Sequence, residues 1–262
     1  MTEAVATLRE RAGLSVFELD VVRPLGVDAY VTTRDGGVSR APYDTLNVAL
    51  HVGDAPEDVA TNRRLVAAAS GVPIDNLITT EQVHGNHVTV VTNTHDRAVG
   101  DALLTTRDDV ALMIMAADCL PLLVVDTATS TIGVIHAGWR GLEAGVLGRS
   151  MEHLSPNTTH VVLGPCISQA AYPVGDDVAQ HFRHVDGAVV ADATPEKWRL
   201  DLALVARHQL RLAGVPDAQV HGFAASTDTG QRFFSDRAQR PCGRFALVAR
   251  RSPYHYAVKG HE

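Results

Sequence analysis

Short apolar segments at close spacing dominate the middle of the chain. Two of them, 112–115 and 122–125, are apolar at consecutive positions, which is typical of strands covered on both faces. Segment 26–33 instead alternates between apolar and polar positions, as a half-buried strand does. Together these patterns predict strands over 26–33, 77–82, 87–91, 110–115, 122–126, 131–136, 160–163, 219–224 and 244–250.

One helix is marked at both of its ends. Asp54 or Ala55 supplies the N-cap, Pro56 lies in the first turn, and a Gly-Val-Pro sequence that begins at Gly71 closes the segment. We therefore predict a helix over 56–70. Further helical patterns cover 140–153, 176–184 and 201–213. Because strands predominate in the middle and helices intersperse later, the pattern predicts an α+β (mixed α/β) fold with strands in more than one sheet.

The length of 262 residues fits one large domain or two small ones. A hydrophobic fraction of 45% and a charged fraction of 20% are those of an ordinary globular protein, which excludes extended disorder, collagen and coiled coil. No repeat, low-complexity tract or linker rich in Pro, Gly and Ser divides the chain. We therefore expect a single domain over 1–262.

The charge balance opposes binding to nucleic acid. The chain has 23 Lys and Arg residues against 30 Asp and Glu residues, a net charge of −7 at pH 7. A C-terminal group of arginines lies partly on a predicted strand, whose alternation places neighbours on opposite faces, so we expect a solvated surface there. These arginines are Arg237, Arg240, Arg244, Arg250 and Arg251.

Membrane insertion and secretion find no support in the sequence. The longest apolar run, 110–117, stops at Asp118 and is far shorter than the ~18–20 residues that span a bilayer. The first residues mix charges and lack the apolar core of a signal peptide. We expect a cytoplasmic protein.

Three potential metal ligands each follow or end an apolar run. His84 comes after a predicted strand, Cys119 follows the buried segment 110–115, and His136 closes another strand. Alone, each reads as a hydrogen-bonded core residue, and the separations of 35 and 17 residues form no short-spaced metal motif. Residues that let the backbone turn sharply or approach a ligand closely stand beside all three: Gly85, Pro121, Gly138 and Gly141.

Cysteine usage is compatible with such a site. Cys119, Cys166 and Cys242 are too few and too scattered for a disulfide framework, so we expect free thiols or ligands.

Several sequence blocks resemble one known family. The central blocks are Gln82-Val-His-Gly85, Ala117-Asp-Cys-Leu-Pro-Leu122, Ile135-His-Ala-Gly-Trp-Arg-Gly141 and Leu163-Gly-Pro-Cys-Ile167. They resemble the signature blocks of the YfiH-like family, also called polyphenol oxidase or laccase-domain proteins. Blocks in the N-terminal half are similar and occur in the same order: Gly36-Gly-Val-Ser39, Tyr43-Asp-Thr-Leu-Asn47, His51-Val-Gly-Asp54 and Val59-Ala-Thr-Asn-Arg63.

The resemblance implies a fold, a metal and an activity. It implies two mixed β-sheets packed face to face with helices outside, in four layers α/β/β/α. It implies a zinc site whose ligands are His84, Cys119 and His136. Members of the family are described as enzymes that phosphorolyse adenosine, inosine and S-methyl-5′-thioadenosine and deaminate adenosine, whereas the older name claims copper-dependent oxidation of phenols.

Ligand chemistry favours zinc over copper here. Multicopper oxidation needs a blue-copper centre and a trinuclear cluster, hence about ten His ligands, commonly in His-x-His pairs. The chain contains no such pair. One site with three ligands and an open position instead suits zinc as a Lewis acid.

Each proposed reaction needs different residues besides the metal ligands. Deamination needs a carboxylate to shuttle protons, and Asp118 is the nearest in sequence, although it can equally be a structural turn residue. Phosphorolysis needs cations for phosphate. Arg63 matches a family residue linked to activity, and Arg140 lies where a helix begins; either can instead be a surface or structural arginine. Asn47 can bind ribose or base through its amide, or only satisfy a turn.

The segment 225–239 departs from the family pattern, which puts its pocket contacts and the substrate preference in question. We predict a zinc-dependent purine nucleoside phosphorylase with adenosine deaminase activity, with purine nucleosides and phosphate as partners, as a monomer or weak homo-oligomer. One alternative is a thiol hydrolase with Cys119 as nucleophile and His136 or His84 as base. A second alternative is the copper-dependent polyphenol oxidase of the older family name, and a third is a non-catalytic sensor of nucleosides or metal.

Overall fold

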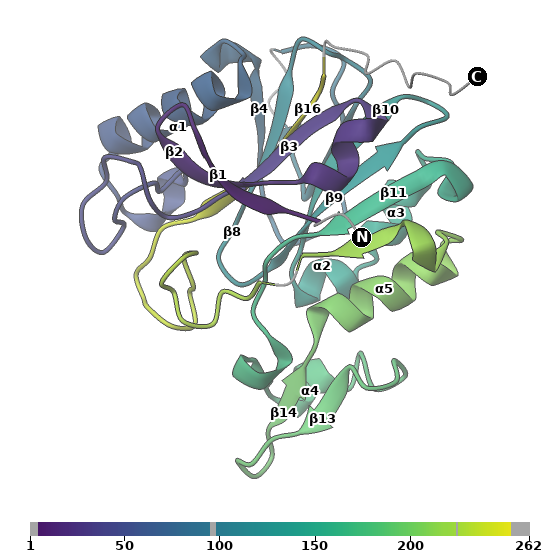
Figure 1. Cartoon of the computed structure of the whole chain (residues 1–262). Helices are drawn as coiled ribbons and strands as arrows, with labels where there is room; N and C mark the ends of the chain where they lie inside the picture. Colours follow the sequence, from purple (N-terminus) through teal and green to yellow (C-terminus); the bar gives the residue numbers. More distant parts are fainter. Residues whose placement is uncertain (1–4, 95–97, 224, 253–262) are drawn as a thin grey trace.

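Two large β-sheets packed face to face form the body of the protein. The structure is a computed structural model, and it describes residues 5–94, 98–223 and 225–252. Helices cover the outer faces of the two sheets (Figure 1). The predicted mixed α/β fold with stacked sheets is therefore confirmed. A third, small sheet was not predicted, and it extends from one end of the body together with a short helix (Figure 1).

The first sheet has seven strands and is antiparallel except at one edge. Its order is β1 (Thr7–Arg11), β2 (Leu14–Glu18), β3 (Val27–Thr32), β16 (Phe245–Arg251), β8 (Ala111–Ala116), β4 (Leu77–Glu81) and β6 (Ala98–Val99). β4 runs parallel to both of its neighbours, β8 and β6. The strands predicted over 26–33, 77–82, 110–115 and 244–250 are all present, whereas the β1–β2 hairpin was missed.

The second sheet has six strands, and the third has three. The order in the second is β15 (Val220–Gly222), β11 (Thr159–Leu163), β9 (Leu120–Asp126), β10 (Thr131–Ala137), β7 (Ala102–Thr105) and β5 (Val88–Val90). The order in the third is β12 (Pro173–Val174), β14 (Trp198–Leu200) and β13 (Val189–Ala191). The last residue of the strand predicted over 219–224 lies outside the described residues.

The helices follow their sequence signals to different degrees. They are α1 (Pro56–Ser70), α2 (Trp139–Glu143), α3 (Val146–Met151), α4 (Asp176–Ala179) and α5 (Leu202–Leu212). α1 has the predicted bounds, and Gly71 ends it in the left-handed conformation. The helix predicted over 140–153 is divided, because Gly145 has a φ of 81° that an α-helix does not allow. The one predicted over 176–184 is reduced to the single turn of α4.

Short 3-10 helices connect several of these elements. They span Asp20–Leu25, Leu50–Val52, Ile74–Asn76, Pro156–Thr158, Gln169–Ala171 and Asp217–Gln219.

The central strands are buried on both faces, as their apolar sequences predicted. On β8, Leu112 and Ile114 face the second sheet, whereas Met113 and Met115 face α1. β9 alternates in the same way between the first sheet and the helices α2, α3 and α5. The core between the sheets is thus shared by both, and two further apolar layers fix the helices outside.

Strand direction brings three distant segments to one end of the two sheets. Since β4 and β8 are parallel, both end at the same edge. The connection after β8 crosses directly into β9 of the second sheet, and β10 is antiparallel to β9, so that β10 ends where β9 begins. The residues that follow β4, link β8 to β9 and close β10 therefore meet.

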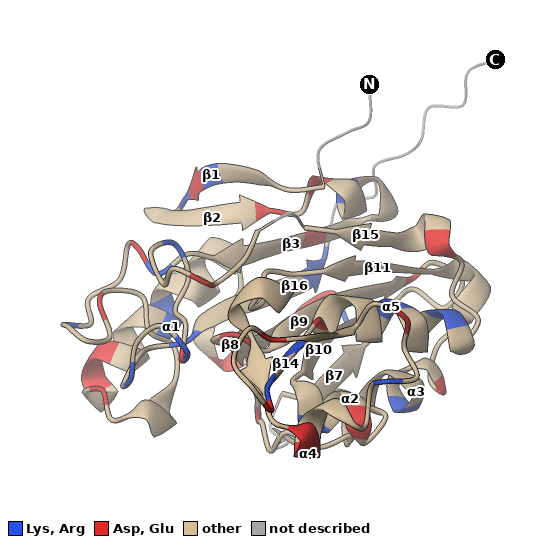
Figure 2. Ribbon diagram, turned by 90° about the horizontal axis from the view of Figure 1, so that it is seen from below, with Lys and Arg blue, Asp and Glu red and all other residues tan. Residues whose placement is uncertain are grey.

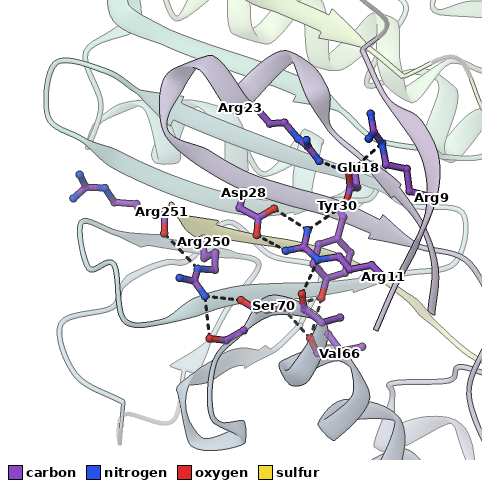
Figure 3. Close-up of polar contacts among 12 residues, drawn as sticks. Arg9, Arg11, Glu18, Arg23, Asp28, Tyr30, Val66, Ser70, Arg250 and Arg251 are labelled. Carbon is purple, nitrogen blue, oxygen red and sulfur yellow. Dashed lines mark hydrogen bonds and ion pairs between the residues drawn. The ribbon is translucent and has the colours of Figure 1, made fainter. Parts of the chain in front are cut away.

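A network of ionic contacts fastens the N-terminal hairpin to the end of α1. Arg11 on β1 forms two hydrogen bonds with Asp28, and its Nε donates to the carbonyl of Ala69 at 2.6 Å (Figure 3). Arg250 donates to the carbonyls of Ser70 and Gly71, which have no partner within the helix. Arg250 was predicted to be solvated surface, and it instead caps α1.

Charged residues of both signs are spread along the ribbon of the fold (Figure 2). Basic and acidic residues are interspersed in the view of Figure 2, in keeping with the net charge of −7. Arg251, another member of the predicted surface cluster, uses its guanidinium to bind the carbonyl of Thr106 at 2.7 Å. Among the described residues, no helix combines the length and apolar character needed to cross a bilayer.

Asp126, at the end of β9, is a buried carboxylate that holds two loops. It accepts hydrogen bonds of 2.6–3.0 Å from the amides of Ala128 and Ser155 and from the hydroxyls of Thr129 and Thr158. Burial alone would raise the pKa of Asp126, but these four donors outweigh it and lower the pKa to about 2.

We predict that the Asp126→Asn variant is less stable than the wild type by about 2 kcal/mol at neutral pH. A carboxylate with a depressed pKa stabilises the fold above its unfolded pKa of ~3.9 and loses that contribution as the pH falls toward its folded value. The difference should therefore narrow between about pH 4 and pH 2, as urea unfolding at each pH will measure. Asp109→Asn, at an exposed ion pair with Arg107, is the control and should change stability by less than about 0.5 kcal/mol. Equal stability of Asp126→Asn and wild type at pH 7 contradicts this account.

Candidate functional site

Three side chains from the meeting strand ends form a compact cluster. His84 follows β4, Cys119 lies in the turn between β8 and β9, and His136 is the penultimate residue of β10. One ligand atom from each lies within 4.8 Å of the other two. The three residues proposed as ligands from the resemblance are therefore brought together, and the group can bind a metal ion.

A buried carboxylate, Asp101, organises two of the three ligands. Its oxygens accept hydrogen bonds from the amides of Val83, His84 and Gly85 at 2.7–3.2 Å, which holds the turn that carries His84. His84 itself has a φ of 58°, a left-handed conformation that costs energy in any residue but glycine. The three amide contacts stabilise that conformation.

Asp101 also orients His136. One carboxylate oxygen lies 2.8 Å from Nδ1 of His136, so Nδ1 is occupied and Nε2 is directed to the cluster. Burial would raise the pKa of Asp101, but the hydrogen bond from His136 and those from the Gly85 and Val83 amides outweigh it and lower the pKa. Sequence reasoning missed Asp101; its signal was one acidic residue directly before the apolar strand β7.

The electrostatics of the cluster favour an ionised thiolate. Burial opposes ionisation of Cys119, but the imidazoles of His136 and His84 outweigh it and lower the thiol pKa to about 6. Burial likewise disfavours the imidazolium of His136, but the Cys119 thiolate and Asp101 raise its pKa to about 9. A thiolate is the form of cysteine that binds metals.

Glycine at position 138 leaves the space that the cluster needs. A Cβ atom there would lie 2.8 Å from Sγ of Cys119 and 3.4 Å from Cδ2 of His84. Any side chain would thus press on the sulfur of Cys119 and lie in contact with the ring of His84. His84 is exposed, whereas His136 is buried, so the cluster is open to solvent on one side.

The cluster opens into a cavity of about 300 Å³ with a cationic wall. Arginines from two distant parts of the chain line this cavity together with the three ligands: Arg140, Arg237, Arg240 and Arg244. The carboxylate of Asp236 also lines it and holds two of these cations, at 2.6 Å from Nε of Arg240 and 3.3 Å from Nη2 of Arg244.

The three C-terminal arginines that line the cavity, here called the arginine wall together with Arg140, lie before the strand that was predicted to begin among them. Arg237, Arg240 and Arg244 were predicted to belong to a solvated surface, with Arg244 at the start of the strand predicted over 244–250, and Arg237 and Arg240 are indeed exposed. Strand β16 begins only at Phe245, so all three precede it on a loop and alternation does not apply to them. The loop places all three at the lining of the cavity that also contains the candidate metal ligands.

Arg140 lies where the sequence placed it, at the start of a helix. It is the second residue of α2, is exposed, and lines the cavity. Its guanidinium lies 4.4 Å from the centre of the Trp139 ring, a cation–π contact that fixes its direction. Trp139 packs against the core around the second sheet with part of its surface on the cavity.

Arg63 lines a second, larger cavity that adjoins the first. This cavity, of about 740 Å³, shares His51, Gln82, His84 and Met115 with the smaller one. Arg63 is partly buried on α1 and donates from Nε to the carbonyl of Val48 at 2.8 Å. Burial lowers its pKa. Arg63 and the four arginines of the wall therefore lie in neighbouring cavities.

Asn47 uses its whole amide within the protein. The residue is fully buried; its amide nitrogen donates to Ala49 and Asp54, and its oxygen accepts from the amides of Ala49 and Arg244. These contacts, one of them to the backbone of Arg244, fit the interpretation that Asn47 satisfies a turn better than that of a substrate ligand.

Asp118 lines the cavity, but its carboxylate is engaged. One oxygen accepts from the hydroxyl of Thr227 at 2.5 Å, and the other accepts from the amide of Arg237 at 2.7 Å. These contacts fit the structural interpretation of Asp118 better than that of a proton shuttle. Cys166 and Cys242 are free thiols outside the cluster.

Most of the chain is similar to proteins of known family. A family model described as "Multi-copper polyphenol oxidoreductase laccase" matches residues 28–252. A purine nucleoside phosphorylase of Pseudomonas aeruginosa is 40% identical over 232 residues, which cover 86% of this chain and 93% of that one. The purine nucleoside phosphorylase YfiH of Escherichia coli is 37% identical over 230 residues, with the same two shares covered. The chain belongs to the YfiH/YlmD family.

Solved structures of the YfiH/YlmD family share the fold described above. The crystal structure of YlmD from Geobacillus stearothermophilus has a TM-score of 0.85 at 32% identity and covers 94% of this chain and 99% of its own. A YfiH protein from Bacillus licheniformis has the same TM-score at 28% identity, covering 93% and 98%. The resemblance seen in the signature blocks is therefore confirmed.

We predict that this member of the YfiH/YlmD family binds one divalent metal ion per chain and that Asp101→Asn weakens this affinity about 10- to 100-fold. The substitution keeps all three ligands but replaces the acceptor that orients His136 and the His84 turn. Metal content by atomic spectroscopy after dialysis against graded chelator measures the effect.

Cys119→Ser should abolish stoichiometric metal in the same experiment, and Cys166→Ser is its matched control. Full metal content in Cys119→Ser, or equal losses in the two cysteine variants, would show that the cluster is not the binding site.

Proposed function

We propose that this chain is a zinc-dependent purine nucleoside phosphorylase. The observation that carries the proposal is one cavity that combines the three-ligand cluster with a wall of four arginines. Relatives at 34–40% identity that are named purine nucleoside phosphorylases support it.

Zinc fits the three ligands and the space that glycine at position 138 leaves beside them. Two imidazoles and one thiolate are borderline-soft donors that zinc accepts in tetrahedral sites, and three protein ligands leave the fourth position for a substrate. Among the described residues, this is the one group of three or more His, Cys, Asp or Glu side chains close enough to hold an ion. A multicopper oxidase needs several such groups, which argues against laccase chemistry here.

The arginines match the needs of phosphorolysis. When bound, zinc supplies a Lewis acid that polarises an oxygen of the substrate. The guanidiniums of Arg140, Arg237, Arg240 and Arg244 bind phosphate and aim one of its oxygens at C1′ of the ribose. That oxygen forms a bond to C1′ while the bond from C1′ to the base breaks, and the base leaves with the electron pair and takes up a proton.

The adjoining cavity supports a broad choice of nucleosides. It is more than twice the volume of the first, and its lining mixes apolar side chains such as Leu50 and Ile78 with polar ones such as Thr79 and the cation of Arg63. This space suits adenosine, inosine and S-methyl-5′-thioadenosine alike, since it favours neither a polar nor an apolar substituent.

Deamination of adenosine is the less favoured second activity of the same site. It needs a carboxylate that moves protons to and from the base. The two carboxylates that line the smaller cavity, Asp118 and Asp236, are both hydrogen-bonded to protein donors. Formation of inosine from adenosine without phosphate tests this activity separately.

A thiol hydrolase is the second candidate function, because Cys119, His136 and Asp101 lie in the order of a catalytic triad. Asp101 holds Nδ1 of His136, and the lowered pKa of Cys119 suits a nucleophile as well as a ligand. His84 distinguishes the two functions. A catalytic triad uses one imidazole beside the thiol, whereas a metal site uses both.

We predict that the enzyme releases free base from inosine only when phosphate is present, and that Arg140→Gln raises the KM for phosphate about 10-fold or more by removing one charge-assisted contact. Initial rates with phosphate varied at saturating nucleoside measure this. Arg149→Gln, at an exposed ion pair on α3, is the control and should leave KM unchanged. Absence of phosphate-dependent product from several nucleosides refutes the phosphorylase.

A second prediction separates ligand from nucleophile. Cys119 should resist alkylation by iodoacetamide in the metal-loaded protein and react rapidly after chelation, since a metal-bound sulfur is shielded. Peptide mass spectrometry measures the modification. Rapid alkylation of a metal-free protein that hydrolyses esters or amides would favour the thiol hydrolase instead.

A further inference from the structure

One carboxylate joins the turn that carries Cys119 to the loop that carries the arginines. Asp118 directly precedes Cys119 and accepts from the hydroxyl of Thr227 at 2.5 Å and from the amide of Arg237 at 2.7 Å. Its own carbonyl accepts from the amide of Ile167 at 3.0 Å. Three segments far apart in the sequence are therefore tied together at Asp118.

The position of the arginine wall depends on the hydrogen bond that the amide of Arg237 donates to Asp118. Asp236, the residue before it, holds Arg240 and Arg244 through its two carboxylate oxygens. The side chain of Arg237 lies over the ring of Tyr172 and donates to a carbonyl of the third sheet. A shift of the backbone at Arg237 would thus move three of the four cations in the cavity.

We propose that Asp118 is a positioning residue, which holds the phosphate-binding arginines at a fixed place relative to Cys119 and takes no part in proton transfer. Both of its oxygens are directed to the loop that it holds. The inference rests on the proposed function, because it takes the arginines to bind phosphate.

The backbone at Asp118 determines which substitutions test this role. Its φ of 87° lies in the left-handed region, which Asn and Gly tolerate and Ala does not. Asp118→Asn keeps an oxygen for the amide of Arg237, and its NH2 group can donate to the hydroxyl of Thr227. Asp118→Gly removes the side chain without straining the turn.

The loop retains a second attachment in these variants. Asp228 accepts from the amide and the hydroxyl of Ser168 at 2.7 and 2.6 Å. Loss of Asp118 should therefore displace the arginines without releasing the loop. Ser168→Ala removes one bond of the second attachment and keeps the other, which makes it a matched control.

The test varies phosphate and inosine separately in steady-state assays of the metal-loaded enzyme. Asp118→Gly should raise the KM for phosphate about 10-fold or more, the loss of two hydrogen bonds to a charged group. The KM for inosine should change less than about 3-fold, and Asp118→Asn and Ser168→Ala should stay within about 3-fold for phosphate. A proton shuttle predicts the opposite, a loss of kcat of about 100-fold in both Asp118 variants with KM for phosphate unchanged, and that result overturns the proposal.

Two measurements without turnover complete the test. Hydrogen exchange of the Arg237 amide should be faster in Asp118→Gly than in wild type and should stay protected in Asp118→Asn. Calorimetric titration with inorganic phosphate should show the same order of affinities. A wild-type protein that binds no phosphate overturns the proposed function and this role with it. Phosphate affinity and Arg237 exchange that are unchanged in Asp118→Gly overturn the positioning role alone.

Discussion

The candidate site depends on the hydrogen bonds of one buried carboxylate, that of Asp101. It joins the turn after β4 to the end of β10 through three amides and the Nδ1 atom of His136. The turn belongs to the first sheet and the histidine to the second. One buried, fully hydrogen-bonded anion therefore holds two ligands from different sheets in register, and Cys119 reaches them on the one connection that crosses from β8 to β9.

Other acidic residues position the cations that surround the ligands held by Asp101. Asp101 positions the ligands, and Asp118 and Asp236 then position the arginines that share the cavity with them. Asn47 adds a hydrogen bond to the backbone of Arg244. Buried or partly buried acids thus hold cations and ligands in place, while the cavity itself presents positive charge and an open cluster. This division suits an enzyme that binds an anion beside a Lewis acid.

Local signals predicted the parts of the fold that local chemistry determines. Pro56 and Gly71 marked both ends of α1, and the consecutive apolar residues of β8 and β9 predicted strands covered on both faces. The third sheet has strands of only two or three residues, too short for a periodic pattern. The outer strand of the missed hairpin, β1, has three charged residues and no buried apolar face, and ionic contacts such as that of Arg11 with Asp28 fasten it.

Local sequence signals predicted less of the candidate site than of the fold. His84, Cys119 and His136 were proposed because their sequence blocks resemble a family, since spacings of 35 and 17 residues carry no metal signature. Asp101 and the arginine wall were missed because their roles arise from tertiary proximity.

A crystal structure of the zinc-loaded enzyme with inosine and phosphate tests the central claim most directly. We predict an anomalous zinc peak at ~2.0–2.3 Å from Nε2 of His136, Sγ of Cys119 and a ring nitrogen of His84, with phosphate against the arginine wall. Zinc bound elsewhere, or phosphate outside that cavity, would contradict it.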